Sequence, residues 1–254
     1  MGEPDLALHR LGGIPLVEPG DNLPTLLQTA MREQGLHLQP GDLLIIAQKI
    51  VSKAEGRIVN LKDIKPSEQA QSLAKETDKD PRLVELILRE SSRVLRTRPG
   101  LIIVEHRLGL ILANAGIDRS NVGGDEDTVL LLPEDPDRSA TQLRTELAAV
   151  TGVAPGVLII DSIGRPWRLG TTGVAIGAVG VPVLTDLRGE QDMFARELQV
   201  AEIAPADSLA AAAALLMGEG AEAIPAVLVR GLPPSDSRQP AATVLRPGHE
   251  DLFK

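Results

Sequence analysis

The sequence predicts a protein that mixes helices and strands without forming one regular parallel sheet. Short apolar runs alternate with segments of helical periodicity along the 254 residues, and Gly-marked irregular loops interrupt that alternation. The chain is long enough to bury a sizeable core. With two Phe, one Trp, no Tyr and no Cys, that core must consist of Leu, Ile, Val and Ala.

Helix signals punctuate the first half of the chain. Asn22 can cap a helix that runs through Met31 and closes at Gly35. The charged stretch 67–79 predicts an exposed helix or lid. Asp80 followed by Pro81 is a typical helix start, and the apolar residues after it supply a broad buried face.

Strands are expected at the apolar runs. Residues 43–47 predict a buried strand, and 101–105 with 108–113 predict a hairpin or meander. The second half repeats the alternation, with strands at 157–161 and 226–229. Ser139 and Gln142 form a capping box for a helix ending at Gly152, and Asp207 can cap an Ala-rich helix to Met217.

Composition and charge exclude several functions. The absence of Cys excludes disulfides, thiolate metal sites and cysteine nucleophiles. A net charge of −9 and the scarcity of aromatic residues argue against nucleic acid and anionic membranes as partners. The N-terminus does not resemble a signal peptide and no stretch resembles a membrane span, so we expect a cytoplasmic protein.

The first segment with chemical potential is QKIVSKAEGR at 48–57, which directly follows an apolar strand. Lys ammonium groups and backbone N–H groups at a strand end can cradle phosphate. An ordinary basic loop would have the same composition, and the segment lacks the P-loop pattern.

A second segment, ANAGIDRSNVGG at 113–124, places an Asp, a Ser and an Asn within four residues after a strand. A carboxylate there can hold a divalent cation and an Asn amide can contact a phosphate or a base. The same residue types are common in surface turns, so the pattern alone leaves both interpretations open.

A third segment, DSIGRPWRLG at 161–170, follows an apolar strand, where α/β proteins tend to bind ligands. The Asp161 carboxylate and the Ser162 hydroxyl are suitable ligands for a hard cation. Two Arg and Trp167 lie in the same segment; the alternative is a helix cap with a buried Trp. Gly218-Glu219-Gly220 is either a phosphate turn with an acidic metal ligand or a helix C-cap.

Together with GIPLV at 13–17, these motifs resemble, in this order, those of the coenzyme F420:L-glutamate ligase family, the F420 gamma-glutamyl ligases. The resemblance extends from Leu8 to Gly231 and leaves a Pro-rich polar tail, 232–254, outside it. It is to the stand-alone form, without the nitroreductase-like domain of larger relatives. It implies the α+β gamma-glutamyl ligase fold, with mixed sheets in two intimate lobes, and a homodimer.

The resemblance also implies a reaction. GTP would drive the attachment of L-glutamate to the phospholactyl carboxylate of the deazaflavin coenzyme F420 precursor through an acyl phosphate, and gamma-linked glutamates would follow. Mg²⁺ or Mn²⁺ would be required, with K⁺ as a further activator. Two alternatives from other classes are a divalent-metal phosphohydrolase and a non-catalytic nucleotide or deazaflavin binding protein.

Residue roles follow from the same resemblance. Asp118 and Asp161 would be catalytic and would bind one divalent ion, Ser162 would bind a second where relatives commonly have Thr, and Glu219 would be a further metal ligand. The implied nucleotide contacts are Ile14, Pro15, Leu16, Val17, Gln48, Lys49, Lys53, Asn121, Gly218, Glu219, Gly220, Ala221, Glu222, Ala223, Ile224 and Pro225. The segment 106–108 departs from the family pattern, on the side expected to contact the acceptor.

Overall fold

A five-stranded mixed sheet forms the centre of the protein, and the computed structural model describes residues 6–252. Its order is β1-β12-β2-β8-β9, and only β2 and β8 run parallel to each other. The strands are β1 (Ala7–Leu11), β12 (Ala226–Arg230), β2 (Leu43–Ala47), β8 (Gly156–Arg165) and β9 (Arg168–Val179).

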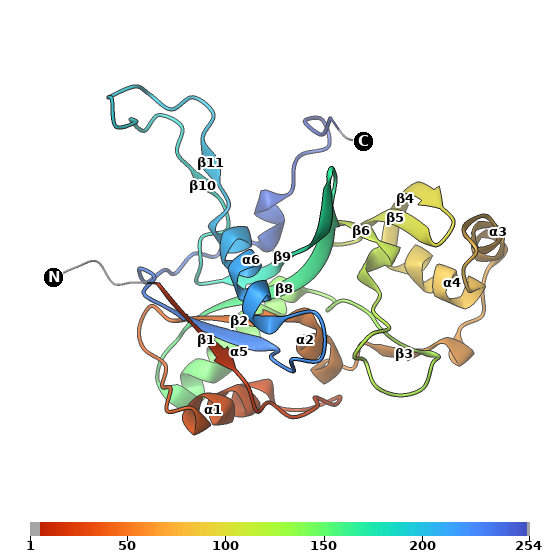
Figure 1. Cartoon of the computed structure of the whole chain (residues 1–254), viewed down its shortest axis with the longest axis horizontal. Helices are drawn as coiled ribbons and strands as arrows, with labels where there is room; N and C mark the ends of the chain where they lie inside the picture. The colour runs from red at the N-terminus through yellow and green to blue at the C-terminus, as the bar shows by residue number, and fades with distance from the viewer. Residues whose placement is uncertain (1–5, 253–254) are drawn as a thin grey trace.

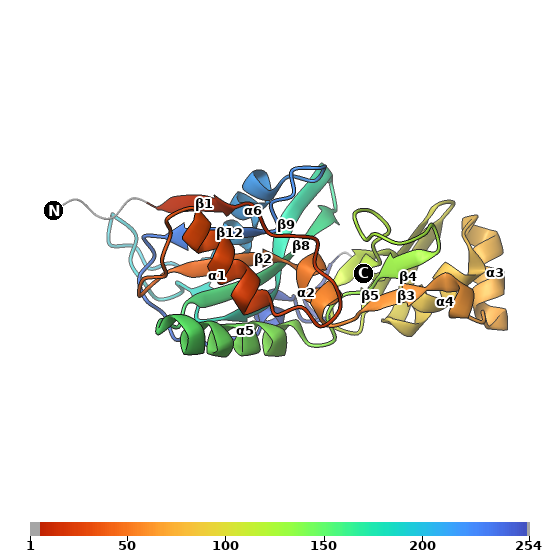
Figure 2. The ribbon, with the colours of Figure 1, turned by 90° about the horizontal axis from the view of Figure 1, so that it is seen from below.

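Helices cover both faces of this sheet, as Figures 1 and 2 show. Helices α1 (Leu23–Glu33) and α5 (Pro136–Thr151) pack on one face, and α6 (Pro205–Met217) packs on the other. Successive side chains of β8 enter opposite cores: Val157 and Ile159 face α1 and α5, whereas Leu158 and Ile160 face α6. The aliphatic composition of the sequence is therefore used on both faces.

A smaller lobe, residues 58–130, extends from one end of the sheet and lies at the right of both views. It has its own aliphatic core, which includes Leu61, Val84, Ile87 and Val104. Its elements are β3 (Ile58–Asn60), η1 (Leu61–Asp63), α3 (Glu68–Thr77), α4 (Pro81–Arg89), β4 (Ser91–Arg98), β5 (Leu101–His106), β6 (Ile111–Ala113), η2 (Asn114–Gly116) and β7 (Thr128–Leu130). Strands β4, β5 and β6 form an antiparallel sheet, and β3 pairs with β7. Helix α2 (Gln48–Ala54) lies between the lobe and the main sheet.

A hairpin arm projects from the main sheet region, and the C-terminal tail packs against it. The strands β10 (Thr185–Asp186) and β11 (Glu202–Ile203) form the base of a hairpin arm that projects in Figure 1. The tail after Gly231 packs on the body: Ser237 O accepts from Gly180 N at 2.8 Å. It contains the short helix η3 (Ala241–Val244). None of the helices between residues 6 and 252 is long and apolar enough to cross a membrane.

The α+β prediction with mixed sheets is confirmed, and so are several elements and caps. Asn22 and Asp80, the predicted starts of two helices, each accept a backbone N–H at the start of α1 and α4. Ser67 caps α3 in the same way and also donates to Glu85 Oε2 at 2.6 Å, 18 residues along the chain. The strands predicted at 43–47 and 226–229 are present as β2 and β12. Local capping chemistry therefore contributes to each of these helix starts.

Two predicted helix starts are wrong. Helix α5 begins one turn before Ser139, because Asp135 accepts from Arg138 N at 3.0 Å and Pro136 takes the first helical position. Ser139 instead donates to Oε1 of the exposed Glu55 at 2.5 Å. Helix α6 begins at Pro205, and the Asp207 carboxylate leaves the helix to accept Ala175 N at 2.9 Å.

The strand predictions also needed correction. The run 108–113 forms a strand only over Ile111–Ala113, because residues 107–109 make a turn in which His106 O accepts from Gly109 N. Strand 157–161 continues to Arg165 and folds back as β9, which the sequence analysis missed. Small residues in β9 conceal the apolar alternation, and Gly177 allows the backbone of Pro136 to approach closely.

Candidate functional site

The polar segment that follows β2 meets the polar second half of β8 where β2 ends. Ala47 pairs with Ile160 in the parallel register, so Gln48 and Asp161 are the next residues of two neighbouring strands. The carboxyl ends of parallel strands lie at the same sheet edge, where α/β proteins commonly bind ligands. The first and third sequence motifs are therefore brought together by strand pairing alone.

Helix α2 begins at this edge and presents an amide and an ammonium group to Asp118. Gln48 Nε2 donates to Asp118 Oδ2 at 2.9 Å, and Lys49 Nζ lies 3.4 Å from the same oxygen. Ser52, one turn later in the helix, donates to Gln48 Oε1 at 2.9 Å. That bond orients the amide so that its N–H₂ group faces the carboxylate.

Lys53 is buried beneath this group. Its Nζ donates to Asn121 O at 2.8 Å. Burial and the neighbouring Lys49 lower the pKa of Lys53 below its ordinary value of 10.5. Two lysines on successive turns of α2 thus concentrate positive charge at one place in an acidic protein.

The site loop, residues 118–128, brings in the second sequence motif. Its first residue is held to β7 by two hydrogen bonds of 2.9 Å between the backbones of Asp118 and Leu130. Asn121 adopts a φ of 56°, in the left-handed region that Asn tolerates, and its Nδ2 donates to Gly220 O at 3.2 Å.

The turn between α6 and β12, residues 218–225, is the fourth segment. Glu219 Oε1 accepts from Ser162 Oγ at 2.5 Å, and Gly220 N donates to Glu222 Oε2 at 2.8 Å. Pro225 O accepts from Ala47 N at 2.8 Å, which fixes the turn beside the end of β2. Each side of the site is therefore joined to another by a direct hydrogen bond.

Burial and neighbouring carboxylates raise the pKa of two aspartates here, Asp161 and Asp118. Burial, the Asp118 charge and the Glu219 charge raise the pKa of Asp161 from 3.8 to about 7, against the Ser162 N–H and Lys49. Burial and Glu219 also raise the pKa of Asp118, although Lys49 and Gln48 oppose the shift. When they are ionised, these carboxylates repel one another, and the positive charge of Lys49 does not fully offset that repulsion.

This donor set suits a hard divalent cation. Carboxylates and a hydroxyl are the ligands that Mg²⁺ and Mn²⁺ prefer, and a cation would relieve the mutual repulsion. Within residues 6–252, no three His, Asp or Glu side chains lie close enough to enclose an ion by themselves. Mg²⁺ is commonly held by one or two carboxylates together with water and substrate phosphates. A site in which the protein supplies only some of the ligands therefore fits this ion.

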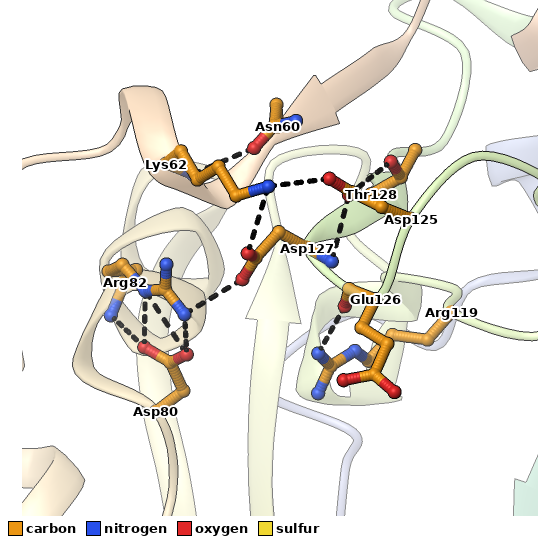
Figure 3. A network of polar contacts seen from close by, with 9 residues as sticks. All are labelled: Asn60, Lys62, Asp80, Arg82, Arg119, Asp125, Glu126, Asp127 and Thr128. Carbon is orange, nitrogen blue, oxygen red and sulfur yellow. Dashed lines mark hydrogen bonds and ion pairs between the residues drawn. The ribbon is translucent and has the colours of Figure 1, made fainter.

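The far side of the site loop is held by the smaller lobe, as Figure 3 shows. Lys62 Nζ lies 2.6 Å from Asp125 Oδ2, and Arg82 Nη2 lies 2.9 Å from Asp127 Oδ1. Arg119 Nη2 donates to Glu126 O at 2.8 Å across the loop. The loop is thus fixed on one side by α2 and the turn 218–225, and on the other by the lobe.

The predicted nucleotide segment 14–17 lies at the border of this arrangement. Val17 is buried in the main core, Ile14 packs against that core and Leu16 is exposed. Gly12, two residues before this segment, lies beside the turn 218–225, because a Cβ added there would lie 3.3 Å from Ile224 Cδ1. Among residues 6–252, the segment 14–17 forms no hydrogen bond with the lysines or carboxylates of the site.

Trp167 does not belong to the site, and the alternative of a buried Trp beside a helix cap is also wrong. It lies at the tip of the β8–β9 hairpin with a φ of 64°, and 87% of its surface is exposed. The four remaining residues of β8 and Pro166 separate it from Asp161, a span of up to about 20 Å at ~3.3 Å per residue. A ten-residue β8 carries the second half of the motif away from the carboxylates.

Two site contacts were not predicted. Ser52 orients Gln48, and Ser120 Oγ accepts from Lys49 Nζ at 3.3 Å. The four-residue spacing of Gln48 and Ser52 would have indicated the first contact, once 48–54 was recognised as a helix. No local signal indicates the second, because it joins residues 71 positions apart.

The fold and these groups define an α+β protein with a lysine-lined, oxygen-ligand site suited to phosphates and a divalent cation. A model of the F420-0:gamma-glutamyl ligase family matches residues 13–231. The chain belongs to this family.

Curated relatives share its length as well as its sequence. The chain is 46% identical over 252 residues to a coenzyme F420:L-glutamate ligase of Methanopyrus kandleri, covering 96% of this chain and 97% of the relative. It is 44% identical to the protein of that name from Methanothermobacter thermautotrophicus, covering 98% and 99%. It is 41% identical to that of Methanocaldococcus jannaschii, covering 85% and 86%.

Proposed function

We propose that this protein is a GTP-dependent ligase that joins L-glutamate to the phospholactyl carboxylate of the deazaflavin coenzyme F420 precursor, and then adds further glutamates through gamma links. The observation that carries the proposal is the meeting of two lysines and three carboxylates from four chain segments at one sheet edge. Membership of the ligase family and the names of the relatives support the substrate assignment.

A carboxylate does not form an amide at a useful rate unless it is activated. In the proposed reaction an acceptor carboxylate oxygen bonds to the γ-phosphorus of GTP while the bond from that phosphorus to the bridging oxygen breaks, which releases GDP. The glutamate amine then attacks the acyl carbon, loses a proton, and displaces inorganic phosphate. Positioning and charge neutralisation dominate such transfers, so no covalent nucleophile on the protein is needed.

The chain's own residues would bind and orient GTP. Lys49 and Lys53 are placed to neutralise phosphate oxygens, and the two lysines lie on the same side of α2 as Gln48 and Asn121. Segments 14–17 and 218–225 would form the remaining wall of the nucleotide site. ATP is the competing nucleotide, and the experiment below compares the two.

We propose Asp118, Asp161, Ser162 and Glu219 as ligands of Mg²⁺ or Mn²⁺. When bound, the ion would neutralise charge that develops on the transferred phosphoryl group. K⁺ activation is proposed from the family resemblance alone, and no residue is assigned to it.

Substrate binding requires an exchange of partners at Asp118. Lys49 Nζ lies 3.4 Å from Asp118 Oδ2 and partly neutralises that carboxylate. An ion held by this oxygen would free the Lys49 ammonium group to contact the substrate phosphates. Lys49 therefore serves both states, which explains why a lysine rather than a neutral donor occupies the position.

The test is a reaction of the purified chain with GTP, Mn²⁺, glutamate and the deazaflavin acceptor. We expect GDP release that depends on both glutamate and acceptor, less release from ATP, and products separated by the mass of one glutamyl residue. GDP release that is indifferent to glutamate and acceptor would indicate a phosphohydrolase. Nucleotide binding without turnover would indicate a non-catalytic binding protein, and either result would overturn the proposal.

We also propose that the ligase acts as a homodimer in the cytoplasm, where GTP and glutamate are supplied. Met193, Phe194 and Val200 are exposed on the hairpin arm that projects from the body. Exposed apolar side chains on a projecting element are typical of surfaces that meet another protein. Light scattering would test the dimer, with a monomer at micromolar concentration contradicting it.

A further inference from the structure

The site loop is attached to the smaller lobe through ion pairs that lie away from the proposed metal ligands. Figure 3 shows that Asp125 and Asp127 point from the loop toward Lys62 and Arg82. Asp118, Ser120 and Asn121 contact the opposite side, toward α2 and the turn 218–225. The same loop therefore carries the site residues on one side and the lobe contacts on the other.

Arg82 is the better anchored of the two cations. Its guanidinium forms hydrogen bonds with Asp80, the N-cap of its own helix, including one of 2.6 Å from Nη2. The same Nη2 lies 2.9 Å from Asp127 Oδ1. Asp80 thus holds the guanidinium in one orientation before it meets the loop, so less side-chain entropy is lost in that contact.

Exposure also distinguishes the two pairs. The side chains of Arg82 and Asp127 are 33% and 24% exposed, whereas those of Lys62 and Asp125 are 59% and 49% exposed. Fully hydrated ion pairs contribute little, because water and salt screen them. The Arg82–Asp127 pair is therefore expected to dominate the attachment.

The loop does not depend on Arg82 for its closed shape. The backbone bonds between Asp118 and Leu130 close its base, and Thr128 Oγ donates to Asp125 Oδ1 at 3.1 Å within it. Arg82 belongs instead to α4, whose apolar side is buried in the core of the smaller lobe. Its contact with Asp127 fixes where the closed loop lies relative to that lobe.

We propose that Arg82, acting through Asp127, is a positioning residue that holds the site loop so that Asp118 and Asn121 face the nucleotide and metal site. The inference deepens the proposed function and rests on it for its catalytic part. Its structural part, the coupling of the lobe to the loop, stands on the contacts alone.

The experiment compares Arg82→Met, Asp127→Asn and the double variant. Met keeps the length of the aliphatic stem and removes the charge, and Asn keeps the shape of Asp127. Arg188→Met is a matched control: Arg188 makes the same contacts to the residue two positions earlier, Asp186, and to a second acid, Glu202, but it lies on the hairpin arm.

Two measurements are made on each variant. Amide hydrogen exchange over residues 118–128 reports how firmly the loop is held against the lobe, without any need for substrate. We expect exchange about 5-fold faster in each single variant, no further increase in the double variant, and no change in the Arg188 control. With GTP and Mn²⁺, the half-saturating Mn²⁺ concentration and the KM for GTP should rise by a similar factor while kcat changes less.

Unchanged loop exchange in Arg82→Met and Asp127→Asn would overturn the proposal, and so would additive effects in the double variant. Equal losses in the Arg188 control, or kinetic losses that follow a fall in Tm, would show a general structural role and overturn it as well. If wild-type protein lacks GTP-dependent glutamate addition, the proposed function fails. In that case the exchange measurement still decides whether Arg82 positions the loop.

Discussion

Replacing Asp161 with Asn should stabilise the metal-free protein while preventing its response to metal. Asn has the shape of Asp without its charge, and its Oδ1 can still accept the Ser162 N–H. A pKa raised from 3.8 to about 7 corresponds to about 4 kcal/mol against the ionised carboxylate, at about 1.4 kcal/mol per pH unit. Asp161 is only partly buried and water can reach it, so we expect a gain of about 1–2 kcal/mol.

The sign of this effect sets its pH dependence. The folded-state pKa of Asp161 lies above the unfolded value, so the native protein holds more protons between about pH 4 and 7. The free energy of unfolding falls as pH rises through that window, and the penalty is complete above about pH 7. The advantage of Asp161→Asn should therefore be largest at pH 8 and nearly absent at pH 4.

Thermal unfolding in a chelator measures the difference directly. At pH 8 the variant should melt about 2–8 °C above wild type, since 1 kcal/mol corresponds to about 2–4 °C for a chain of this size. Mn²⁺ with GTP should raise the Tm of wild type and leave the variant nearly unchanged. Asp137→Asn is the control: burial raises the pKa of Asp137 too, but it lies outside the site and should keep the metal response.

A variant that is no more stable than wild type at pH 8 in chelator would refute the electrostatic reasoning. An advantage that persists unchanged at pH 4 would refute it equally, because the charge responsible would then be absent. If the variant kept the full metal response, Asp161 would not be a metal ligand.

Three further predictions concern single side chains. Lys53→Met removes the ammonium group that donates to Asn121 O and should weaken GTP binding about tenfold by calorimetry; an unchanged Kd would exclude Lys53 from the phosphate contacts. Ser162→Ala should lower ligase turnover about tenfold, whereas Ser162→Thr keeps the hydroxyl and should retain most of it; equal losses would contradict the assignment. Gly177→Ala should lower the free energy of unfolding by about 1–3 kcal/mol, because its Cβ would lie 2.4 Å from Pro136 O. The same change at Gly164, where a Cβ meets nothing within 4 Å, should leave the denaturation midpoint unchanged, and matching midpoints for both variants would refute the packing argument.

Elements with strong local signals were predictable from the sequence. Asn22, Ser67 and Asp80 cap helices through bonds to backbone N–H groups two or three residues away, so the responsible atoms are close in the chain. Strand β2 is a short, continuous apolar run that is buried on both faces. Each of these signals depends on a few consecutive residues.

Elements determined by distant contacts were not predictable. Ser139 has the sequence context of a cap, but its hydroxyl donates a hydrogen bond to Glu55. Asp207 likewise accepts a hydrogen bond from a backbone N–H of β9 instead of capping its own helix. Strand β9 is rich in small residues because Pro136 and Ala210 pack closely against it, which hides its alternation. Sequence propensity shows that these residues can cap a helix, whereas the distant partner decides which group each side chain bonds.

The candidate site shows the same division. Asp118, Asp161, Lys49 and Lys53 were predicted from their positions after apolar strands and from the family resemblance, and the structure brings them together. Trp167 was misplaced because a motif read as one loop is a long hairpin, and extended strand separates its two ends. Proximity in sequence indicates proximity in space within a turn, but not along a strand.

The part of the site that depends on the bound state lies beyond any sequence pattern. Asp118 is shared by Gln48 and Lys49 at 2.9 and 3.4 Å, and these contacts satisfy a carboxylate that we propose as a metal ligand. The sequence shows which side chains are present, but not which of them would contact Asp118 with and without a bound cation. If Asp118 binds the proposed ion, the ion would displace Gln48 or Lys49 from it. Asp161 is opposed only by the Ser162 N–H and the Lys49 charge, and burial raises its pKa to about 7. The residue most disfavoured in its charged form is therefore the one that should respond most strongly to the ion.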